Sequence, residues 1–435
     1  MAQILTAKLK LLLTPAQHAA LRATQLAYRD GLNAVSRYSF AHGKISSAAK
    51  LQQAMYGELR GTHRLPAQLA CAVCRQVGAT YQGLWTKVRQ NATHRRAGHT
   101  TRRYRGLDRP PKYVAPTLAY TYGRDYGFKT GQTVSLITLT GRVVVPYLGY
   151  GKHVALIQTG ARAGGAKLWY DPRRQQFYLL VSLEIAVPDP APEQQPHVVG
   201  VDVGIRYLAV TATPTGQQTF YSGKPVRHRA AHYHRKRQQL QQQGTRSATR
   251  RLRQVAGRER RFRLDVNHRI ARAIVTAHPQ SLIGLEDLTH IRERTNRRHS
   301  KKASAKQRRA NRRQATWSFA ELQAQIAYKA ALAGSVVVQV EADFTSQQCL
   351  RCGHRSKGNR PGQGLSFVCE QCGARLHADL VGARNIALRT LLVRQDWIST
   401  GGLSTRPDGS GDEAKAARLQ RYAELRPSPD PSLPL

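Results

Sequence analysis

Two pairs of cysteines carry the strongest chemical signal in the chain. Cys349 and Cys352 form one Cys-x-x-Cys pair, Cys369 and Cys372 form a second, and 16 residues separate the pairs. A glycine follows each pair and permits the tight turn that directs two sulfurs at one ion. Four thiolates at this spacing are the ligand set of a closed, tetrahedral Zn²⁺ site, so we predict one structural zinc ion. The alternative of four unrelated thiols leaves the repeated spacing unexplained.

A third pair, Cys71 and Cys74, has no second pair near it in the sequence. It lies in a segment whose apolar residues recur at helical spacing. Thiols three residues apart on a helix are usually small, buried packing residues. We therefore leave this pair out of the predicted metal site.

Three carboxylates stand in apolar surroundings. Asp202 interrupts the strand-like run VVGVDVGI, Glu286 ends SLIGLEDL, and Asp379 lies in HADLVGARNIA near the start of a predicted helix. A carboxylate in such a run must be paired or hold a cation. Each alone could instead be a turn residue or a salt-bridge partner, with an Arg or Lys neutralising it.

Taken together, the three acids predict a site for two Mg²⁺ ions. The chain has 25 Asp+Glu against 69 Lys+Arg, so acids embedded in apolar runs need an explanation. Three carboxylates supply the hard oxygen ligands that two Mg²⁺ ions and a phosphodiester between them require. Asp202 is expected to bridge both ions because it lies on the central strand. The order Asp, Glu, Asp favours hydrolysis in a RuvC-like site over the Asp-Asp-Glu order of strand-transferring transposases.

The net charge of +44 indicates a polyanionic partner. Such a surplus repels itself unless phosphates neutralise it, and ordinary solubility needs only a few net charges. The tract 224–264 contains one acid, Glu259, and the tract 290–317 contains one, Glu293. Dense charge runs are usually solvated surface or disordered. Because these two flank predicted metal ligands, we favour a channel that grips a nucleic-acid backbone.

The pattern of apolar residues predicts the elements that position these groups. A strand over 4–13 precedes a helical stretch from 14 to about 91, a basic linker over 92–115 and strands between 131 and 187. From residue 197, strands alternate with helices, which predicts an α/β sheet domain. A long basic helical segment is expected over about 224–276. Tyr233 and Trp317 could stack on bases or equally belong to the core.

No stretch of the sequence approaches the length of a membrane span, and the first residues lack the long apolar run of a signal peptide. These observations predict a cytoplasmic protein without a membrane partner. Six cysteines in such a compartment suggest metal ligands or free thiols rather than disulfides.

Four segments resemble the TnpB family, whose members are encoded by insertion sequences and are related to compact type V CRISPR effectors. They are GVDVGIRYLAV, IGLEDL, WSFAELQAQIAYKAALAGSVVVQVEADFTSQQCLRCGH and HADLVGARNI. The resemblance covers residues 197–392 and extends more loosely to LLLTPAQHAALRATQLAYRDGLNA. The third motif departs from the common D-x-N-A-A-x-N form, because Val381 and Gly382 replace an Asn and an Ala.

The resemblance implies an RNA-guided DNA endonuclease encoded by a transposable element. It also implies a prokaryotic cell, in which the protein would be associated with the nucleoid when on DNA. Its partners would be a guide RNA derived from that element and double-stranded target DNA. By motif match, Asp202, Glu286 and Asp379 would be catalytic and hold two Mg²⁺ ions. The same match assigns one zinc ion to the four cysteines, Cys349, Cys352, Cys369 and Cys372.

The implied fold is multidomain, with an N-terminal β-barrel that carries an inserted helical recognition domain and a C-terminal α/β RNase H-like (RuvC) domain that carries an inserted zinc ribbon. We expect residues 1–196 to bind RNA and DNA, with the barrel formed by about 1–13 and 116–190 and the helical insertion by about 14–115. The remaining boundaries are 197–344 plus 374–395 for the RuvC-like domain and 345–373 for the zinc ribbon. Residues 396–435 are expected to form a mostly disordered tail with a helical piece near 414–425.

Three other functions remain open at this point. A nuclease-inactive guided DNA-binding protein or repressor would be expected to lack at least one of the three acids. A transposase, or a DNA-binding protein accessory to one, would be expected to show the Asp-Asp-Glu order or strand-transfer products. A structural RNA-binding protein would account for the charge and leave the acids and cysteines without a role.

The charge makes a direct prediction about salt. If about six or more phosphates are neutralised, nucleic-acid affinity should fall roughly 10³-fold or more between about 50 and 200 mM salt. The measurement is a binding titration across that range at constant pH. A flat response would contradict an electrostatic grip on the backbone.

Overall fold

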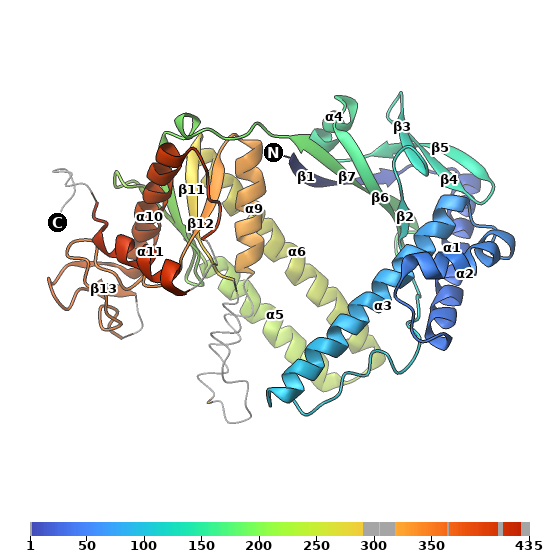
Figure 1. The fold of residues 1–435 in the computed structure, drawn as a ribbon, viewed down its shortest axis with the longest axis horizontal. Helices are drawn as coiled ribbons and strands as arrows, with labels where there is room; N and C mark the ends of the chain where they lie inside the picture. Colours follow the sequence, from blue (N-terminus) through green and yellow to red (C-terminus); the bar gives the residue numbers. More distant parts are fainter. Residues whose placement is uncertain (1, 290–303, 305–317, 363–364, 408–411, 428–435) are drawn as a thin grey trace. The chain divides into compact units, whose positions relative to one another are not determined.

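In the structure, a computed structural model, the chain forms two compact units, 2–186 and 187–435 (Figure 1). The residues described are 2–289, 304, 318–362, 365–407 and 412–427. The second basic tract, 290–317, therefore lies outside the described residues apart from Ser304.

The first unit is an antiparallel sheet with three long helices inserted after its first strand. The sheet order is β2-β6-β7-β1-β5-β4-β3. Its strands are β1 (Ala2–Leu11), β2 (Leu118–Tyr120), β3 (Tyr126–Lys129), β4 (Thr133–Thr138), β5 (Gly141–Leu148), β6 (Arg162–Asp171) and β7 (Gln176–Ala186). The helices are α1 (Pro15–Ala41), α2 (Ala48–Gly61), α3 (Ala67–Arg96) and the short α4 (Gly151–Gln158).

The seven strands form a nearly closed barrel. Side chains alternate along β1, so that Ala7, Leu9 and Leu11 are fully buried in the core while the residues between them face outward. Two tyrosines tie the edges together across the gap. Tyr126 of β3 donates to the Gly164 carbonyl of β6 at 2.7 Å, and Tyr120 of β2 donates to a β4 carbonyl. The barrel part of the predicted fold is thereby confirmed.

The inserted helices confirm the helical periodicity seen from residue 14. Thr14 caps α1 in a reciprocal capping box with Gln17. The helices pack through buried polar contacts as well as apolar ones, such as the Tyr81 hydroxyl that donates to the Ser36 carbonyl at 2.8 Å. Cys74 is fully buried in this core, where burial raises the pKa of its thiol to about 11. That environment suits a packing residue.

The second unit is built on a mixed five-stranded sheet of order β10-β9-β8-β11-β12. β8 and β11 are parallel, as are β11 and β12, whereas β9 runs antiparallel to both β8 and β10. The strands are β8 (His197–Asp202), β9 (Tyr207–Ala212), β10 (Gln218–Ser222), β11 (Ser281–Glu286) and β12 (Val336–Val340). The helices are η1 (Pro192–Gln194), α5 (Lys224–Gln243), α6 (Arg246–Ala277), α9 (Phe319–Leu332), α10 (Ala378–Thr400) and α11 (Asp412–Glu424).

Helices cover both faces of this sheet. On one face, Val199 and Val201 of β8 and Ile283 of β11 pack in a core with residues of α6 and α9. The alternate residues of the same strands face α10, whose Trp397 packs with Val198. Because successive side chains point to opposite faces, residues 198, 200 and 202 of β8 all lie on the α10 side.

α10 crosses the sheet at unusually close range over two glycines. A Cβ atom on Gly200 of β8 would lie 2.2 Å from the Ala383 carbonyl oxygen, and one on Gly284 of β11 would lie 1.8 Å from the Thr390 hydroxyl. The two glycines are paired in the parallel register of β8 and β11. The helix therefore rests on a flat strip of backbone that no larger residue could form.

The basic helical segment expected over about 224–276 is confirmed, and it is divided into two helices. Gly244 ends α5 in the left-handed conformation at φ 63°, and the Thr245 hydroxyl caps α6 by accepting from the Ala248 amide. Glu259, the single acid of the tract, is buried and forms an ion pair with Arg237 of α5. It holds the two basic helices together.

The C-terminal tail is more ordered than expected from its composition. Of the segment 396–435, residues 396–400 complete α10 and residues 412–424 form α11, whose Tyr422 is buried. The helical piece expected near 414–425 is thus confirmed, whereas its anchoring contacts come from residues distant in sequence. Among the described residues, no helix is long and apolar enough to cross a membrane.

The close crossing makes a prediction about stability. Gly200→Ala should destabilise the second unit by about 1–3 kcal/mol or more, because the new methyl group meets backbone atoms that cannot move aside. Gly257→Ala in α6 is the matched control and should stabilise by about 0.5–1 kcal/mol, since its Cβ meets nothing closer than 3.6 Å. Chemical denaturation, followed by hydrogen exchange in β8 and α10, measures both. Equal stability of the two variants would contradict the close contact.

Candidate metal centres

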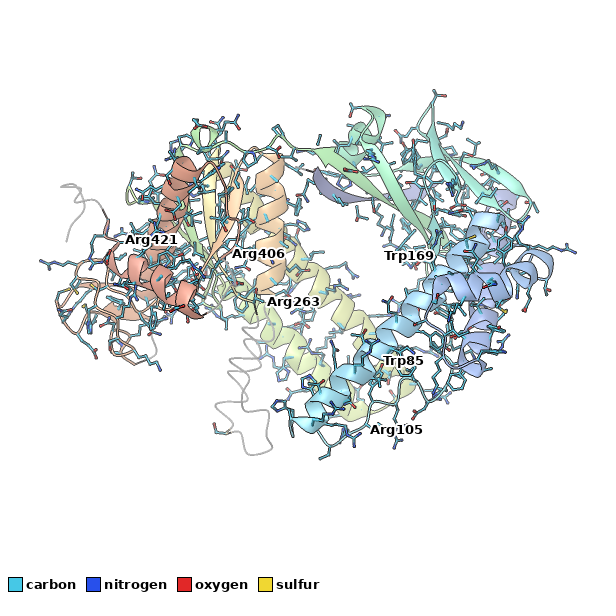
Figure 2. All side chains as sticks on the ribbon, viewed as in Figure 1. Trp85, Arg105, Trp169, Arg263, Arg406 and Arg421 are labelled. Carbon is cyan, nitrogen blue, oxygen red and sulfur yellow. The ribbon has the colours of Figure 1, made fainter. Side chains whose placement is uncertain are left out.

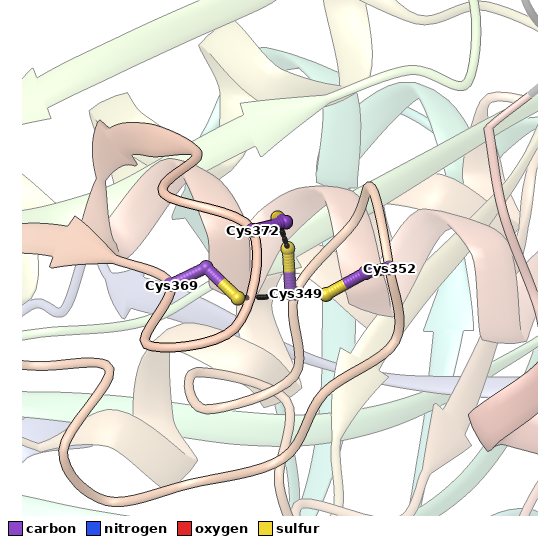
Figure 3. Close-up of side chains that lie close together, drawn as sticks. All are labelled: Cys349, Cys352, Cys369 and Cys372. Atoms are coloured by element: carbon purple, nitrogen blue, oxygen red, sulfur yellow. Dashed lines mark hydrogen bonds between the residues drawn. The ribbon is translucent and has the colours of Figure 1, made fainter.

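The four predicted cysteines meet in one cluster (Figure 3). Cys349 Sγ lies 3.6 Å from Cys372 Sγ, and Cys352 Sγ lies 3.5 Å from Cys369 Sγ. Four sulfurs around one Zn²⁺ at about 2.3 Å would stand roughly 3.8 Å apart in an ideal tetrahedron. All four are free thiols, and burial raises the pKa of Cys349 to about 12, so a thiolate there calls for a cation. The donor set and its spacing fit zinc.

Two matching turns build this cluster. In the first, the Gly353 amide donates to the Cys349 carbonyl, and in the second the Gly373 amide donates to the Cys369 carbonyl. Both glycines adopt positive φ, 79° and 72°, which favours glycine over any residue with a side chain. A two-stranded sheet of β13 (Ser366–Val368) and β14 (Arg375–His377) carries the second turn.

The three predicted acids also converge. Asp202 ends β8 and Glu286 ends the neighbouring parallel strand β11, each one residue beyond the register pair Val201–Leu285. Both therefore lie on the α10 face of the sheet, at the same edge. Asp379, in the first turn of α10, stands over them with a side chain about one-fifth exposed. Three separate elements bring three acids to one place.

Electrostatics shows that the acids interact. Burial raises the pKa of Asp202 well above its usual range, and the carboxylates of Glu286 and Asp379 raise it further. Burial also raises the pKa of Glu286, against the lowering effect of a hydrogen bond from Thr345 and of Arg389. Like charges forced together in partial burial are relieved by a bound cation.

The carboxylates are more widely spread than the thiols. Among the described residues, the four cysteines are the one group of three or more His, Cys, Asp or Glu residues whose ligand atoms all lie within 4.8 Å of one another. A looser spread suits oxygen ligands that are shared between two ions about 4 Å apart, and carboxylate oxygen is the donor that Mg²⁺ prefers. The three acids therefore fit hard divalent cations.

The two unusual residues of the third motif have separate neighbours. Val381 is fully buried in a core with Cys349, Cys369 and Phe367, so it joins α10 to the cysteine cluster. Gly382 faces Asp202, and a Cβ there would lie 3.0 Å from Asp202 Oδ2. The glycine leaves space beside the carboxylate that an alanine would narrow.

Three further residues around the acids were missed by sequence reasoning. Thr345 donates its hydroxyl to Glu286 Oε1 at 2.5 Å, and buried Asn385 donates to the Thr345 carbonyl at 2.7 Å. Arg360, between the two cysteine pairs, places Nη2 4.0 Å from Asp379 Oδ1. Threonine, asparagine and arginine are common at the surface, and only the spatial arrangement distinguishes these three.

The fold and the two sites define a multidomain protein with a nearly closed barrel, a mixed α/β sheet domain, a carboxylate cluster and a four-cysteine cluster that fits zinc. A family described as "Probable transposase" matches residues 181–291, and one described as "Cas12f1-like, TNB domain" matches residues 319–386.

Two curated proteins illustrate the relationship. "CRISPR-associated endodeoxyribonuclease Cas12f1" of Sulfoacidibacillus thermotolerans is 27% identical over 57% of this chain, and the match spans 58% of that protein. "Putative RNA-guided DNA endonuclease InsQ" of Escherichia coli (strain K12) is 26% identical over 61% of this chain and 66% of its own length. The chain is thus a TnpB-like relative of the compact type V effectors.

Among solved structures, a cryo-EM structure of a Cas12f1-sgRNA-target DNA complex aligns with a TM-score of 0.36 and 16% identity, over 89% of this chain and 99% of that one. The mini-RNA-guided endonuclease Cas_phi3 aligns with a TM-score of 0.46 and 11% identity, over 90% and 93%.

The cysteine cluster predicts a specific metal loss. Cys369→Ser should reduce bound zinc from about one equivalent to near zero, because a closed structural site needs all four ligands. It should also destabilise the core that Cys369 shares with Val381. Mass-spectrometric metal analysis of the purified protein is the measurement, with Cys71→Ser as the matched control that keeps its zinc. Unchanged zinc in Cys369→Ser would refute the site.

Proposed function

We propose that the protein is an RNA-guided DNA endonuclease encoded by a transposable element. Its active site would be formed by Asp202, Glu286 and Asp379 with two Mg²⁺ ions. One observation carries the proposal: the carboxylates of three separate elements converge at one edge of the sheet, close enough for Glu286 and Asp379 to raise the pKa of Asp202. A fold gains no stability from such an arrangement, so the arrangement is explained by what it binds.

The strand order supports an RNase H-like (RuvC) domain. The sheet places β8 at its centre, with β9 and β10 on one side in an antiparallel hairpin and β11 and β12 on the other side in parallel. Asp202 and Glu286 stand at the carboxyl ends of adjacent parallel strands, where ligands bind open α/β sheets. We propose residues 197–344 plus 374–395 for this domain and 345–373 for the zinc ribbon.

The chemistry follows from the chain's own groups. Bound Mg²⁺ would lower the pKa of the attacking water and stabilise the leaving oxygen. Asp202, between its two neighbours, would be the shared ligand, and Glu286 and Asp379 would each supply further carboxylate oxygens. The guanidinium of Arg360 lies beside Asp379, where it can pair with a phosphate oxygen of the substrate.

Guide RNA and double-stranded target DNA are the proposed partners. The net charge of +44 needs polyanions to neutralise it, and α5 presents a run of exposed Arg and Lys to solvent. The names of both curated relatives describe nucleases that act on DNA, and one of them is named as RNA-guided. We propose that the barrel and its helical insertion, residues 1–196, hold the RNA and its duplex with target DNA.

The first test combines RNA sequencing with cleavage. RNA that co-purifies with the protein is sequenced, and the complex is incubated with Mg²⁺ and plasmids that carry randomised target-adjacent sequences. A discrete RNA from the flanking element, together with guided double-strand breaks, is the expected result. An unspecific RNA population without cleavage would contradict guided nuclease activity and favour a nonspecific nucleic-acid-binding protein.

Asp202→Asn separates catalysis from binding. Cleavage should fall by more than the roughly 100-fold that loss of a supporting residue can cause, while nucleic-acid affinity stays unchanged. Because the raised pKa means that ionised Asp202 opposes folding at neutral pH, the metal-free variant should be at least as stable as wild type. Asp265→Asn removes an exposed partner of Arg269 and is the control. Loss of binding or of stability in Asp202→Asn would make the residue structural.

A further inference from the structure

The turn that follows β12 has a strained backbone. Residues Glu341–Thr345 run from the end of β12 towards the first cysteine pair, and Phe344 within them adopts φ 62° with a bulky side chain that is 41% exposed. Large side chains rarely occupy the left-handed region, and such strain persists only where surrounding contacts hold it.

α10 grips the turn from one side. The guanidinium of Arg389, which is fully buried, donates to the Glu341 carbonyl at 2.5 Å and to the Asp343 carbonyl at 2.8 Å. Asn385, one turn earlier on the helix, donates to the Thr345 carbonyl at 2.7 Å and to the Gln348 carbonyl at 2.9 Å. Three carbonyls of the turn, and that of Gln348 just beyond it, are thus fixed by two side chains of one helix.

Side chains of α11 bind the two acidic side chains of the turn. The buried Glu341 carboxylate accepts from the Tyr422 hydroxyl at 2.7 Å and pairs with Arg418, and Lys415 pairs with Asp343 at 2.9 Å. The ring of Tyr422 also lies 4.5 Å from the Arg389 guanidinium. α11 therefore touches both the turn and the arginine that secures it.

The turn presents one side chain to the carboxylate cluster. Thr345 donates its hydroxyl to Glu286 Oε1. The Thr345 hydroxyl oxygen also lies 3.1 Å from the Ala342 carbonyl oxygen within the turn. Glu286 is held at its backbone as well, because Gln323 of α9 donates to its carbonyl at 2.8 Å. The orientation of the Glu286 side chain thus depends on where the strained turn places Thr345.

We propose that Thr345 is the positioning residue for Glu286, and that α11 acts as a clip that fixes the turn Glu341–Thr345 and so the Thr345 hydroxyl. This inference rests on the proposed function for its catalytic meaning, because Glu286 is taken there as a metal ligand. Residues that orient metal ligands typically change affinity or activity about 10- to 100-fold when they are lost. The clip itself is a physical linkage that can be tested without any cleavage.

The first experiment tests the hydroxyl. Thr345→Val keeps the shape of the side chain and removes the donor, whereas Thr345→Ser keeps the donor. Mn²⁺ is the probe, and its binding to the protein–RNA complex is followed by the electron paramagnetic resonance of the free ion. The binding that Asp202→Asn abolishes defines the site. We expect Thr345→Val to weaken that binding by about tenfold or more and Thr345→Ser to restore it.

The second experiment tests the clip in the full-length chain. Tyr422→Phe removes only the hydroxyl that donates to Glu341, which leaves a buried carboxylate with one partner fewer. Arg421→Ala is the matched control on the same helix, because the exposed side chain of Arg421 (labelled in Figure 2) pairs with Asp396 of α10 rather than with a residue of the turn. Tyr422→Phe should speed amide hydrogen exchange in residues 341–345 and weaken Mn²⁺ binding, and Arg421→Ala should do neither.

The outcomes separate the two proposals. Wild-type Mn²⁺ affinity in Thr345→Val, or equal losses in the Val and Ser variants, would overturn the role of the hydroxyl. Equal exchange in Tyr422→Phe and Arg421→Ala would overturn the clip. If wild type binds no Mn²⁺ in an Asp202-dependent way while Tyr422→Phe still speeds exchange, the proposed metal site and the role of Thr345 towards it fail, and the clip stands.

Discussion

The close crossing of α10 over β8 and β11 is the contact on which the second unit depends. At Gly200 the helix backbone meets the strand backbone with no side chain between them, and at Gly284 the Thr390 side chain occupies the place that a Cβ atom would take. At that distance the helix cannot slide or roll without collision. Its first turn is consequently fixed above the ends of both strands, and Asp379 is fixed above Asp202 and Glu286.

The same helix connects the two candidate metal centres. Its side chains serve different neighbours in turn: Val381 packs with the cysteine cluster, Gly382 gives space to Asp202, and Asn385 binds the turn that carries Thr345. The cysteine cluster is therefore part of the support for the carboxylates rather than a separate appendage. This arrangement also gives a structural meaning to Val381 and Gly382, the two departures from the common form of the third motif.

The features that could be predicted from the sequence are those that depend on residues close together in the chain. The alternation of β1, the helical periodicity after Thr14 and the Cys-x-x-Cys-Gly turns each depend on neighbours in sequence, and the structure confirms them. The convergence of Asp202 and Glu286 was expected from two apolar strands that each end in an acid. Whether these acids bind metal stays a prediction.

What the sequence could not reveal depends on distant contacts. The position of α11 depends on Glu341, about 80 residues earlier in the chain, because the Glu341 carboxylate accepts a hydrogen bond from Tyr422. Thr345, Asn385 and Arg360 belong to common residue types, and nothing near them in sequence indicates that they meet at the carboxylates. The break at Gly244 was missed because the basic composition is the same on both sides of it.

The interval from Asp379 to Thr390 in α10 has an evolutionary consequence. Each residue added to a helix rotates everything beyond it by about 100°. One insertion after Asp379 would swing Val381 away from the cysteines, Asn385 away from the turn and Thr390 away from its glycine at the same time. Many single residues of this stretch could be substituted, but residues could not be inserted or deleted. The number of residues between Asp379 and Thr390 is therefore constrained, because all of these contacts depend on it at once.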